Sequence, residues 1–292
     1  MRVVIVGAGA VGQAYGFMLA AAGAQVTFLV RPKYVEALED GVWVYPEAKG
    51  PVRWTDYELT TEPMACDQVW FCVSSTALPH CPLDWPGALG VFLQPGLHDR
   101  TVMRQHFSET NLVRGVIPFI AFQAPLPDEE REHPGILWWF PPLMRLPFSG
   151  PRANEVTRHL PRAHMTARVD DNAHRMSASM LPTIAALQLG EWSFRGMDKD
   201  LAARGIREAT SVAAAVHGLG DLMTPPAMAL SMLAGLSPLL VPFNLEVYTK
   251  YHFTKVKDQT RASLKDWIAE GEQRGLEVHT LKHLLDRLHA IG

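Results

Sequence analysis

The feature that most constrains this chain is a glycine pattern that follows directly on a short apolar strand at the N-terminus. The chain begins Met-Arg-Val-Val-Ile-Val-Gly-Ala-Gly-Ala-Val-Gly, and a predicted helix follows. In this arrangement Gly7 makes the tight turn off the strand, Gly9 lets the backbone approach a pyrophosphate, and Gly12 lets the helix pack closely on the sheet. Free N–H groups at the helix start, where Ala10 and Val11 lie, favour phosphate binding. The pattern therefore predicts a dinucleotide site.

The same segment has a second interpretation as a secretory signal peptide, because Arg2 precedes an apolar run that small residues follow. Regularly placed glycines interrupt that run, and a second predicted strand at residues 25–30 follows without a break. We therefore expect the segment to be folded structure. Cys66, Cys72 and Cys81 form no Cys-x-x-Cys pair and no disulfide-like framework, which favours a cytoplasmic protein.

The end of the second predicted strand indicates which nicotinamide cofactor fits. Proteins that select NAD usually place Asp or Glu there to hold the ribose 2′-hydroxyl. This strand ends instead in Arg31-Pro32, with Lys33 next. A guanidinium can pair with a 2′-phosphate through charge-assisted, forked hydrogen bonds, although a solvated arginine at a strand end is the plainer alternative. The sequence therefore predicts NADP as the cofactor and Arg31 as the residue that selects it.

Composition excludes several classes of function. A chain of 292 residues, with 48% hydrophobic and 20% charged residues, is expected to form two globular domains. A formal net charge of −3 gives no electrostatic reason to expect binding to nucleic acid or a membrane. The uncharged residues 222–245 are long enough to cross a bilayer, but their four prolines favour a broken pair of buried helices. His279 and His283 lack a third ligand, so no metal site is predicted.

The order of the predicted elements indicates an α/β fold. Strands that alternate with helical stretches, such as the one at residues 35–38, predict a doubly wound domain with strands covered on both faces. We assign this domain to residues 1–169. Because ligands bind beyond the carboxyl ends of such strands, Ser74, Ser75 and Pro95 are expected near the cofactor. The later strands are predicted at residues 42–45, 51–54 (paired with 42–45), 67–73, 90–94 and 113–121.

The remaining residues, 170–292, read as an all-helical domain. Helices are predicted at residues 173–189, 201–217, 259–273 and 281–288. The region before this domain is dense in proline and aromatic residues. Its paired Trp138 and Trp139 either line a substrate pocket or, as we favour, pack an edge strand.

Together these features resemble the ketopantoate reductase family. The likeness rests on Gly-Ala-Gly-Ala-Val-Gly at residues 7–12, on Arg31 after the second strand, and on the helical C-terminal domain. The resemblance implies a Rossmann-type N-terminal domain, NADPH as cofactor, and reduction of a 2-oxo acid to a 2-hydroxy acid in the cleft between the domains. It also implies a lysine at the start of the first long C-terminal helix as proton donor, an acid near the C-terminus that orients the substrate, and a monomer or homodimer.

The sequence departs from the family pattern where the proton donor is expected. Arg175 lies in the segment that carries the family's lysine, and no lysine occurs between Lys49 and Lys199. Ser74 or Ser75 stands in place of the family's basic residue after the third main strand. The loop after the next strand lacks the asparagine of the family's Asn-Gly.

Other residues are therefore predicted to carry the chemistry. Arg175 would hold a substrate carboxylate or stabilise an oxyanion, but a pKa above about 12 makes it a poor acid. The polar residues 248–258 form either a site or a solvated helix face. Asp266 is the acid that we match to the family's substrate-orienting residue. The candidate proton donors are His174, Tyr251, His252 and Lys255, of which we favour the last two.

The sequence thus predicts one principal function and leaves two alternatives open. The principal one is an NADPH-dependent oxidoreductase that reduces a small, 2-oxo acid-like carbonyl compound at an interdomain cleft. The alternatives are a non-catalytic NADP(H)-binding sensor or partner-binding protein, and an opine-type imine reductase that needs an amine as second substrate. A small molecule is the expected substrate, with neither nucleic acid nor membrane as partner.

Overall fold

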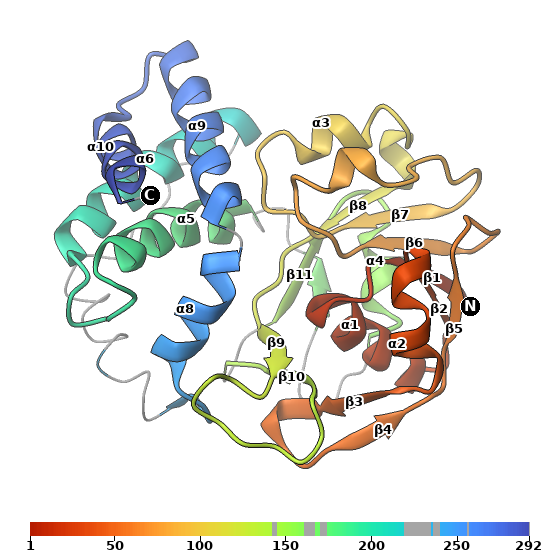
Figure 1. The fold of residues 1–292 in the computed structure, drawn as a ribbon. Helices are drawn as coiled ribbons and strands as arrows, with labels where there is room; N and C mark the ends of the chain where they lie inside the picture. Colours follow the sequence, from red (N-terminus) through yellow and green to blue (C-terminus); the bar gives the residue numbers. More distant parts are fainter. Residues whose placement is uncertain are drawn as a thin grey trace. The chain divides into compact units, whose positions relative to one another are not determined.

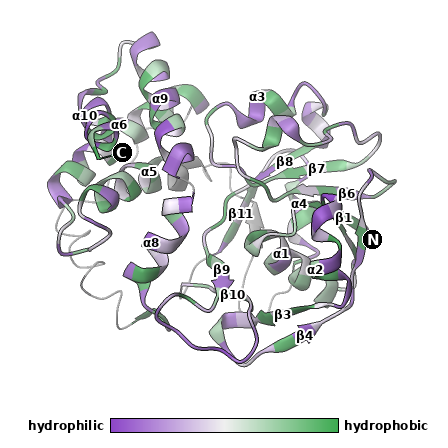
Figure 2. Cartoon of the chain, viewed as in Figure 1, coloured by the Kyte–Doolittle hydropathy of each residue, from purple (hydrophilic) through white to green (hydrophobic). Residues whose placement is uncertain are grey.

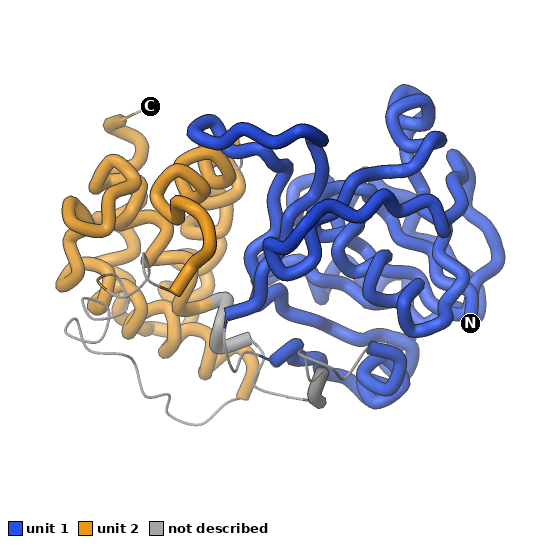
Figure 3. Tube along the Cα trace, turned by 90° about the horizontal axis from the view of Figure 1, so that it is seen from below, with its two compact units in different colours: residues 1–173 blue, residues 174–292 orange. Residues whose placement is uncertain are grey.

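The computed structural model describes residues 1–141, 145–160, 167–169, 174–218, 235, 240–255 and 257–291. The chain divides into two compact units, Met1–Ala173 and His174–Gly292, drawn in blue and orange in Figure 3. The sequence analysis places the domain boundary slightly earlier, between positions 169 and 170. Each unit has buried hydrophobic residues of its own.

The first unit is built on an eight-stranded sheet, with strands in the order β12-β11-β8-β7-β6-β1-β2-β5 (Figure 1). All neighbouring strands run parallel except β11 and β8. The strands are β1 (Arg2–Val6), β2 (Gln25–Leu29), β5 (Glu58–Thr60), β6 (Gln68–Phe71), β7 (Leu89–Phe92), β8 (Leu112–Gly115), β11 (Leu146–Ser149) and β12 (Ala167–Val169).

Strand β1 shows why these residues form a buried parallel strand. Val3 and Ile5 belong to one hydrophobic cluster and Val4 and Val6 to another, and none of the four is more than 3% exposed. A strand covered on both faces gains free energy from apolar side chains at every position, so hydrophobic and polar residues do not alternate along it.

The topology places a ligand site at the carboxyl end of β1. The chain runs from β1 to β2 on one side and later crosses back to β6 on the other side of β1. Val6 of β1 is level with Leu29 of β2 and with Phe71 of β6, so the loops that leave the three strands meet at one edge of the sheet. Open α/β sheets bind their ligands at such a reversal of strand order.

A second, four-stranded sheet has the order β4-β3-β10-β9 in the described part of the chain. The predicted pairing of residues 42–45 with 51–54 is confirmed, with Val42 opposite Trp54. Trp54 and Trp138 lie beside Phe17 of helix α1 (Ala10–Ala21), at ring-centroid distances of 5.6 and 5.4 Å. Helix α1 also contacts the large sheet, because its Tyr15 lies 5.1 Å from Trp70 of β6 between ring centroids, so it packs against both sheets. The strands are β3 (Val42–Tyr45), β4 (Val52–Trp54), β9 (Ile120–Ala124) and β10 (Gly135–Trp139).

Two expectations about this region need correction. The predicted single strand at residues 113–121 is wrong, because β8 ends at Gly115 in the large sheet and β9 begins at Ile120 in the small one. Pro118 lies between them and cannot donate a ladder hydrogen bond. Trp138 packs in the core as expected, with 1% of its surface exposed, but its strand lies in the middle of the small sheet and not at an edge.

Short helices complete the first unit. The helical element expected at residues 35–38 is confirmed as α2 (Glu36–Glu39), which follows the single turn η1 (Pro32–Tyr34). The others are α3 (Asp99–Met103), α4 (Ala153–Thr157), η2 (Pro46–Ala48), η3 (Leu78–His80) and η4 (Glu109–Asn111).

The second unit is helical throughout its described residues, and the four predicted helices are confirmed with small differences at their ends. Helix α10 illustrates the pattern: Leu281, Leu284 and Leu288 are fully buried, whereas His283 and Arg287 are exposed. Figure 2 shows the same mixture of hydrophobic and hydrophilic residues along these helices. The helices are α5 (His174–Leu189), α6 (Lys199–His217), α8 (Leu245–Lys255), α9 (Lys257–Gln273) and α10 (His279–Ala290).

Local interactions determine where helix α6 begins and ends and how closely it packs. The Asp198 side chain accepts a hydrogen bond from Leu201 N at 2.9 Å and caps the N-terminus, and Gly218 ends the helix with a φ of 64°. A side chain at Gly205 would place Cβ 2.9 Å from Pro182 of α5. The predicted fold class, an α/β Rossmann-type domain followed by an all-helical domain, is confirmed.

The described helices include none that is long and apolar enough to cross a membrane. The broken helices expected at residues 222–245 fall mostly outside the described residues. Within the described ranges, no group of three or more His, Cys, Asp or Glu residues could hold a metal ion.

Candidate cofactor-binding site

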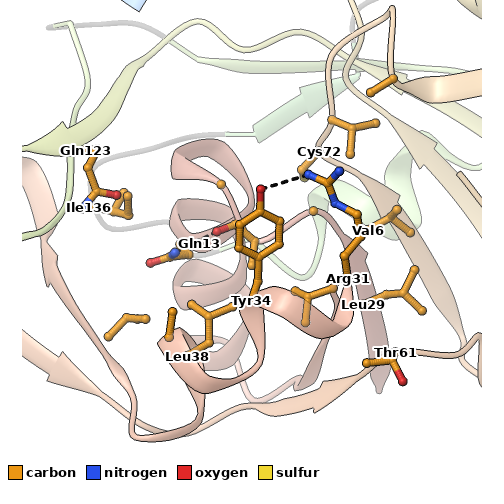
Figure 4. A pocket seen from close by; sticks show the side chains of 18 of the residues that line it. Val6, Gln13, Leu29, Arg31, Tyr34, Leu38, Thr61, Cys72, Gln123 and Ile136 are labelled. Atoms are coloured by element: carbon orange, nitrogen blue, oxygen red, sulfur yellow. Dashed lines mark hydrogen bonds between the residues drawn. The ribbon is translucent and has the colours of Figure 1, made fainter. Parts of the chain in front are cut away.

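A cavity of about 940 Å³ lies in the first unit, at the carboxyl ends of β1, β2 and β6. Four of the predicted cofactor residues line it: Gly7, Gly9, Arg31 and Ser74. Figure 4 shows the cavity in front of α1, with Arg31 and Tyr34 on one side and Gln123 and Ile136 of the small sheet on the other. Its volume is at the upper end of the range for small-molecule and cofactor sites, so a dinucleotide fits.

The glycines at the cavity meet two different constraints. Gly7 has a φ of +101°, and a Cβ there would lie 2.9 Å from Val73. A Cβ at Gly12 would lie 2.0 Å from the Gly7 carbonyl oxygen, so only glycine lets the helix approach the turn. A Cβ at Gly9 would meet no atom within 4 Å, which leaves open space beside the backbone. This is the cradle that a pyrophosphate requires.

Ala10 and Val11 contribute through their backbone. They are the first two residues of α1, whose N-cap residue, Gly9, has no side chain to cap the helix. The N–H groups of a helix's first turn have no partner within the helix and carry the positive end of its dipole. Their position beside the open space at Gly9 fits an anionic group.

Ser74, Ser75 and Pro95 differ in what they offer the cavity. Ser74 lines it, and its Oγ accepts a hydrogen bond from Ala77 N at 3.2 Å, which shapes the turn after β6. Ser75 Oγ donates instead to Asp99 Oδ2 at 2.8 Å, and Pro95 is exposed; neither residue lines the cavity. The structure therefore places Ser74 at the site and Ser75 and Pro95 in loops next to it.

The loops after β6 and β7 are joined by a buried glutamine. Gln94 is 2% exposed, and its Nε2 donates to the carbonyl oxygens of Phe71 at 3.0 Å and Val73 at 2.8 Å. Together with the Ser75–Asp99 bond, these contacts hold the two loops at a constant separation. A ligand that spans the ends of β6 and β7 would therefore meet a rigid wall.

Sequence reasoning missed two residues that line the cavity, Gln13 and Tyr34. Gln13 is 6% exposed; its Nε2 donates to Ala8 O at 2.8 Å, and its Oε1 has no hydrogen-bond partner among the described residues. Tyr34 accepts a hydrogen bond from Arg31. Tyr34 could have been found from the sequence, because Pro32 begins a turn that brings Tyr34 back toward Arg31.

The cavity offers no reactive thiol. Cys72 lines it, but burial raises the pKa of the Cys72 thiol well above its ordinary value. Burial also raises the pKa of the Cys81 thiol, although the nearby Arg31 opposes that shift. Because the thiolate is the nucleophile, burial makes both residues less reactive than an exposed cysteine.

The predicted catalytic residues lie in the second unit. Arg175 belongs to α5, but its side chain is outside the described residues. His252 and Lys255 lie one turn apart on α8, and Asp266 lies on α9. Lys255 Nζ is 3.6 Å from the centre of the Tyr251 ring.

The surroundings of His252 determine its protonation state. Its imidazole lies against the rings of Tyr248 and Phe253, at centroid distances of 5.3 and 4.8 Å. Burial, together with the positive charge of Lys255, lowers the pKa of His252 to about 4. At neutral pH the imidazole is therefore uncharged, and it can donate one hydrogen bond but not serve as a strong acid.

Residues 3–133 match the sequence model of the family described as ketopantoate reductase PanE/ApbA. This range contains the glycine turn, Arg31 and every residue named above that lines the cavity except Ile136. The chain is thus similar to the ketopantoate reductase PanE/ApbA family over this N-terminal domain. A comparison with curated protein sequences found no match.

Solved structures resemble this chain over nearly its whole length. The 2-dehydropantoate 2-reductase from Geobacter metallireducens GS-15 is 19% identical with a TM-score of 0.74, and the match covers 100% of both chains. The PanE/ApbA family ketopantoate reductase from Ralstonia eutropha JMP134 is 18% identical with a TM-score of 0.69, covering 100% of this chain and 98% of that one. D-mandelate dehydrogenase, solved with NADH and anilino(oxo)acetate, is 15% identical with a TM-score of 0.72, covering 99% and 97%. These similarities establish the fold.

The close contact at Gly12 and the open space at Gly9 predict different effects of an alanine substitution at the two positions. Gly12→Ala should lower the free energy of unfolding by about 2 kcal/mol or more, because the new Cβ would press on the Gly7 backbone. Gly9→Ala should leave stability unchanged but weaken NADPH binding at least about tenfold, because its Cβ would enter the pyrophosphate space. Urea unfolding and isothermal titration calorimetry measure the two effects. Equal destabilisation of both variants, or wild-type NADPH binding by Gly9→Ala, contradicts the assignment.

The low pKa of His252 predicts a pH-dependent loss of stability. Between its ordinary pKa of 6.5 and about 4, the unfolded chain binds a proton that the folded chain does not, so the free energy of unfolding falls as pH falls through this window. His252→Asn should remove this contribution, which is at most about 3 kcal/mol. Urea unfolding at pH 6.5, 5.5 and 4.5 measures it, with the exposed His283→Asn as control. The same pH dependence in wild type and His252→Asn would show that the imidazole is not desolvated.

Proposed function

We propose that this protein is an NADPH-dependent oxidoreductase that reduces a small, 2-oxo acid-like carbonyl compound in the cleft between its two domains. The observation that carries the proposal is the glycine cradle at Gly7, Gly9 and Gly12, which opens on a cavity of dinucleotide size with Arg31 in its wall. It lies in the domain that matches the sequence model of the ketopantoate reductase family.

Charge at the end of β2 supports NADP over NAD. Arg31 stands at the place where NAD-selecting proteins carry an acidic residue, and no carboxylate within the described residues forms an ion pair with it. A guanidinium without a carboxylate partner is available to a 2′-phosphate. The structural relative D-mandelate dehydrogenase was solved with NADH, so cofactor choice varies among proteins of this fold and needs direct measurement.

A bound nicotinamide would supply the hydride, and the chain's own residues would hold the carbonyl compound and deliver the proton. We assign Arg175 to the substrate carboxylate or the developing oxyanion and Asp266 to substrate orientation. Of the two predicted donors we favour Lys255. The imidazole of His252 is uncharged at neutral pH, so it lacks the extra proton that an imidazolium would transfer to the substrate. His252 would then act as a neutral hydrogen-bond donor beside the substrate.

The substrate need not be ketopantoate, because the family's lysine is absent. Within the sequence no lysine occurs between Lys49 and Lys199, and Arg175 cannot replace its acid function. The same absence is the observation that favours the second candidate function, an NADP(H)-binding sensor or partner-binding protein without turnover.

The experiment that tests the proposal follows NADPH absorbance with the purified protein and a panel of 2-oxo acids that includes ketopantoate, while protein-bound NADPH is monitored by fluorescence. Oxidation of NADPH with at least one 2-oxo acid is the expected result. Oxidation that requires an added amine would identify an imine reductase. Tight NADPH binding without oxidation under any condition would establish the non-catalytic alternative.

The cofactor assignment predicts a selective effect of Arg31→Ala. NADPH binding should weaken by about tenfold or more, whereas NADH binding should change less than about twofold, because only NADPH carries the 2′-phosphate. Calorimetric titration of both cofactors measures this, and Lys49→Met, which removes an exposed charge away from the cavity, is the matched control. Equal weakening for both cofactors would remove Arg31 from the 2′-phosphate site.

A further inference from the structure

We propose that Tyr34 determines cofactor specificity by holding Arg31 and Lys33 together as one cationic site for the 2′-phosphate of the adenosine ribose. The inference rests on the proposed function, because Arg31 and Tyr34 line the same cofactor cavity and Lys33 lies between them in the chain. It adds a hydroxyl and a second positive charge to the single arginine that the sequence pattern indicates.

The geometry centres on the tyrosine ring. Arg31 Nη2 donates a hydrogen bond to Tyr34 Oη at 3.0 Å, which Figure 4 marks with a dashed line. Arg31 Cζ lies 5.0 Å from the centre of the Tyr34 ring, and Lys33 Nζ also lies 5.0 Å from it. Both distances are within the range of cation–π attraction. One aromatic ring therefore contacts two cations at the same time.

The local backbone brings these three side chains together. Pro32 is the first residue of the η1 turn, and its ring restricts φ to the value that the turn needs. The turn is closed by Tyr34 N, which donates to Arg31 O at 2.9 Å. This places the tyrosine next to the arginine that precedes the turn, with no contribution from distant parts of the chain.

The charges of this group have no counter-ion in the part of the chain that the structure describes. Among the described residues, neither Arg31 nor Lys33 lies within ion-pair distance of a carboxylate. Two like charges on one ring repel each other, and an anion placed between them would relieve that repulsion. The arrangement is therefore suited to an anion of more than one negative charge, such as a phosphate monoester.

Tyr34 also supplies a donor of its own. Its oxygen accepts the hydrogen bond from Arg31, so the hydroxyl proton is free to be donated to a phosphate oxygen. The side chain is 42% exposed although it is large and aromatic, and it lines the cavity. A position in a binding site accounts for this exposure, whereas a role in core packing does not.

The test measures binding of 2′,5′-ADP and 5′-AMP, two probes that differ only in the 2′-phosphate, by isothermal titration calorimetry on the full chain. Tyr34→Phe should weaken 2′,5′-ADP binding about three- to tenfold and leave 5′-AMP binding within about twofold. Tyr34→Leu, which also removes the ring, should weaken 2′,5′-ADP binding about ten- to thirtyfold. Lys33→Met should weaken 2′,5′-ADP binding by about threefold or more, whereas the control Lys49→Met should have no effect.

A double variant, Arg31→Ala with Tyr34→Phe, tests whether Tyr34 acts on 2′,5′-ADP binding by positioning Arg31. Because part of the effect of Tyr34 passes through the arginine, Tyr34→Phe should weaken 2′,5′-ADP binding by a smaller factor when Arg31 is already alanine than in the wild type. Full additivity would overturn the positioning role. Thermal unfolding of each variant shows whether that variant is still folded. Tyr34→Phe removes only the hydroxyl and keeps the aromatic ring, so we expect this variant to fold.

The outcomes distinguish this inference from the proposed function. If Arg31→Ala lowers 2′,5′-ADP affinity but neither Tyr34 variant does, Tyr34 has no role in specificity and the NADP assignment stands. If wild-type protein binds the two probes equally, the cavity has no 2′-phosphate site, and both the inference and the NADP assignment fail. Equal weakening of both probes by Tyr34→Phe would show that the tyrosine contacts the adenosine and not the phosphate.

Discussion

The rest of the first unit depends on the close approach of helix α1 to the turn that follows strand β1. Gly12 lies so near the Gly7 carbonyl that no side chain can stand between them, and Gly9 O accepts the first helical hydrogen bond from Gln13 N at 2.9 Å. This contact aims the N-terminus of α1 at the end of β1. Because backbone atoms meet backbone atoms, the approach cannot be adjusted by a side-chain rotamer.

Packing on both sides of α1 makes that position rigid. Tyr15 lies against Trp70 of the large sheet at a ring-centroid distance of 5.1 Å, and Phe17 lies against Trp138 of the small sheet at 5.4 Å. A helix held on one face could tilt, but one held between two sheets cannot without opening an aromatic core. The small sheet thus contributes to the candidate cofactor site in two ways, because Gln123 and Ile136 line the cavity and Trp138 helps to fix the helix that begins at the glycine turn.

The cavity and the second unit divide the chemistry in the proposed function. The cavity wall combines open backbone, a cation group and two half-buried thiols whose pKa is raised by burial. The second unit supplies titratable groups, and burial of His252 among aromatic rings changes what that residue can do. The lysine that donates the proton in the family pattern is absent from this chain. The proposed proton donor therefore lies on α8, where Lys255 is one helical turn from the neutral imidazole of His252.

Much of the fold could be predicted because its signals are local. The glycine spacing, the unbroken apolar run of β1 and the amphipathic helices each depend on residues that are close in sequence, and each prediction was confirmed. The prediction for residues 113–121 was wrong because those residues leave one sheet and enter another. Such a change depends on partners such as β10, which pairs with β9 from farther along the chain.

The sequence by itself determined the turn, the dinucleotide cradle and the presence of a cation after β2, because backbone freedom and charge belong to individual residues. Only the tertiary structure decided which of these residues act together. It placed Arg31 and Tyr34 in the wall of the same cavity as Gly7 and Gly9, linked the loops after β6 and β7 through Gln94, and lowered the pKa of His252. Distances between side chains and the loss of water around them depend on the whole packed core, and a local pattern does not carry that information.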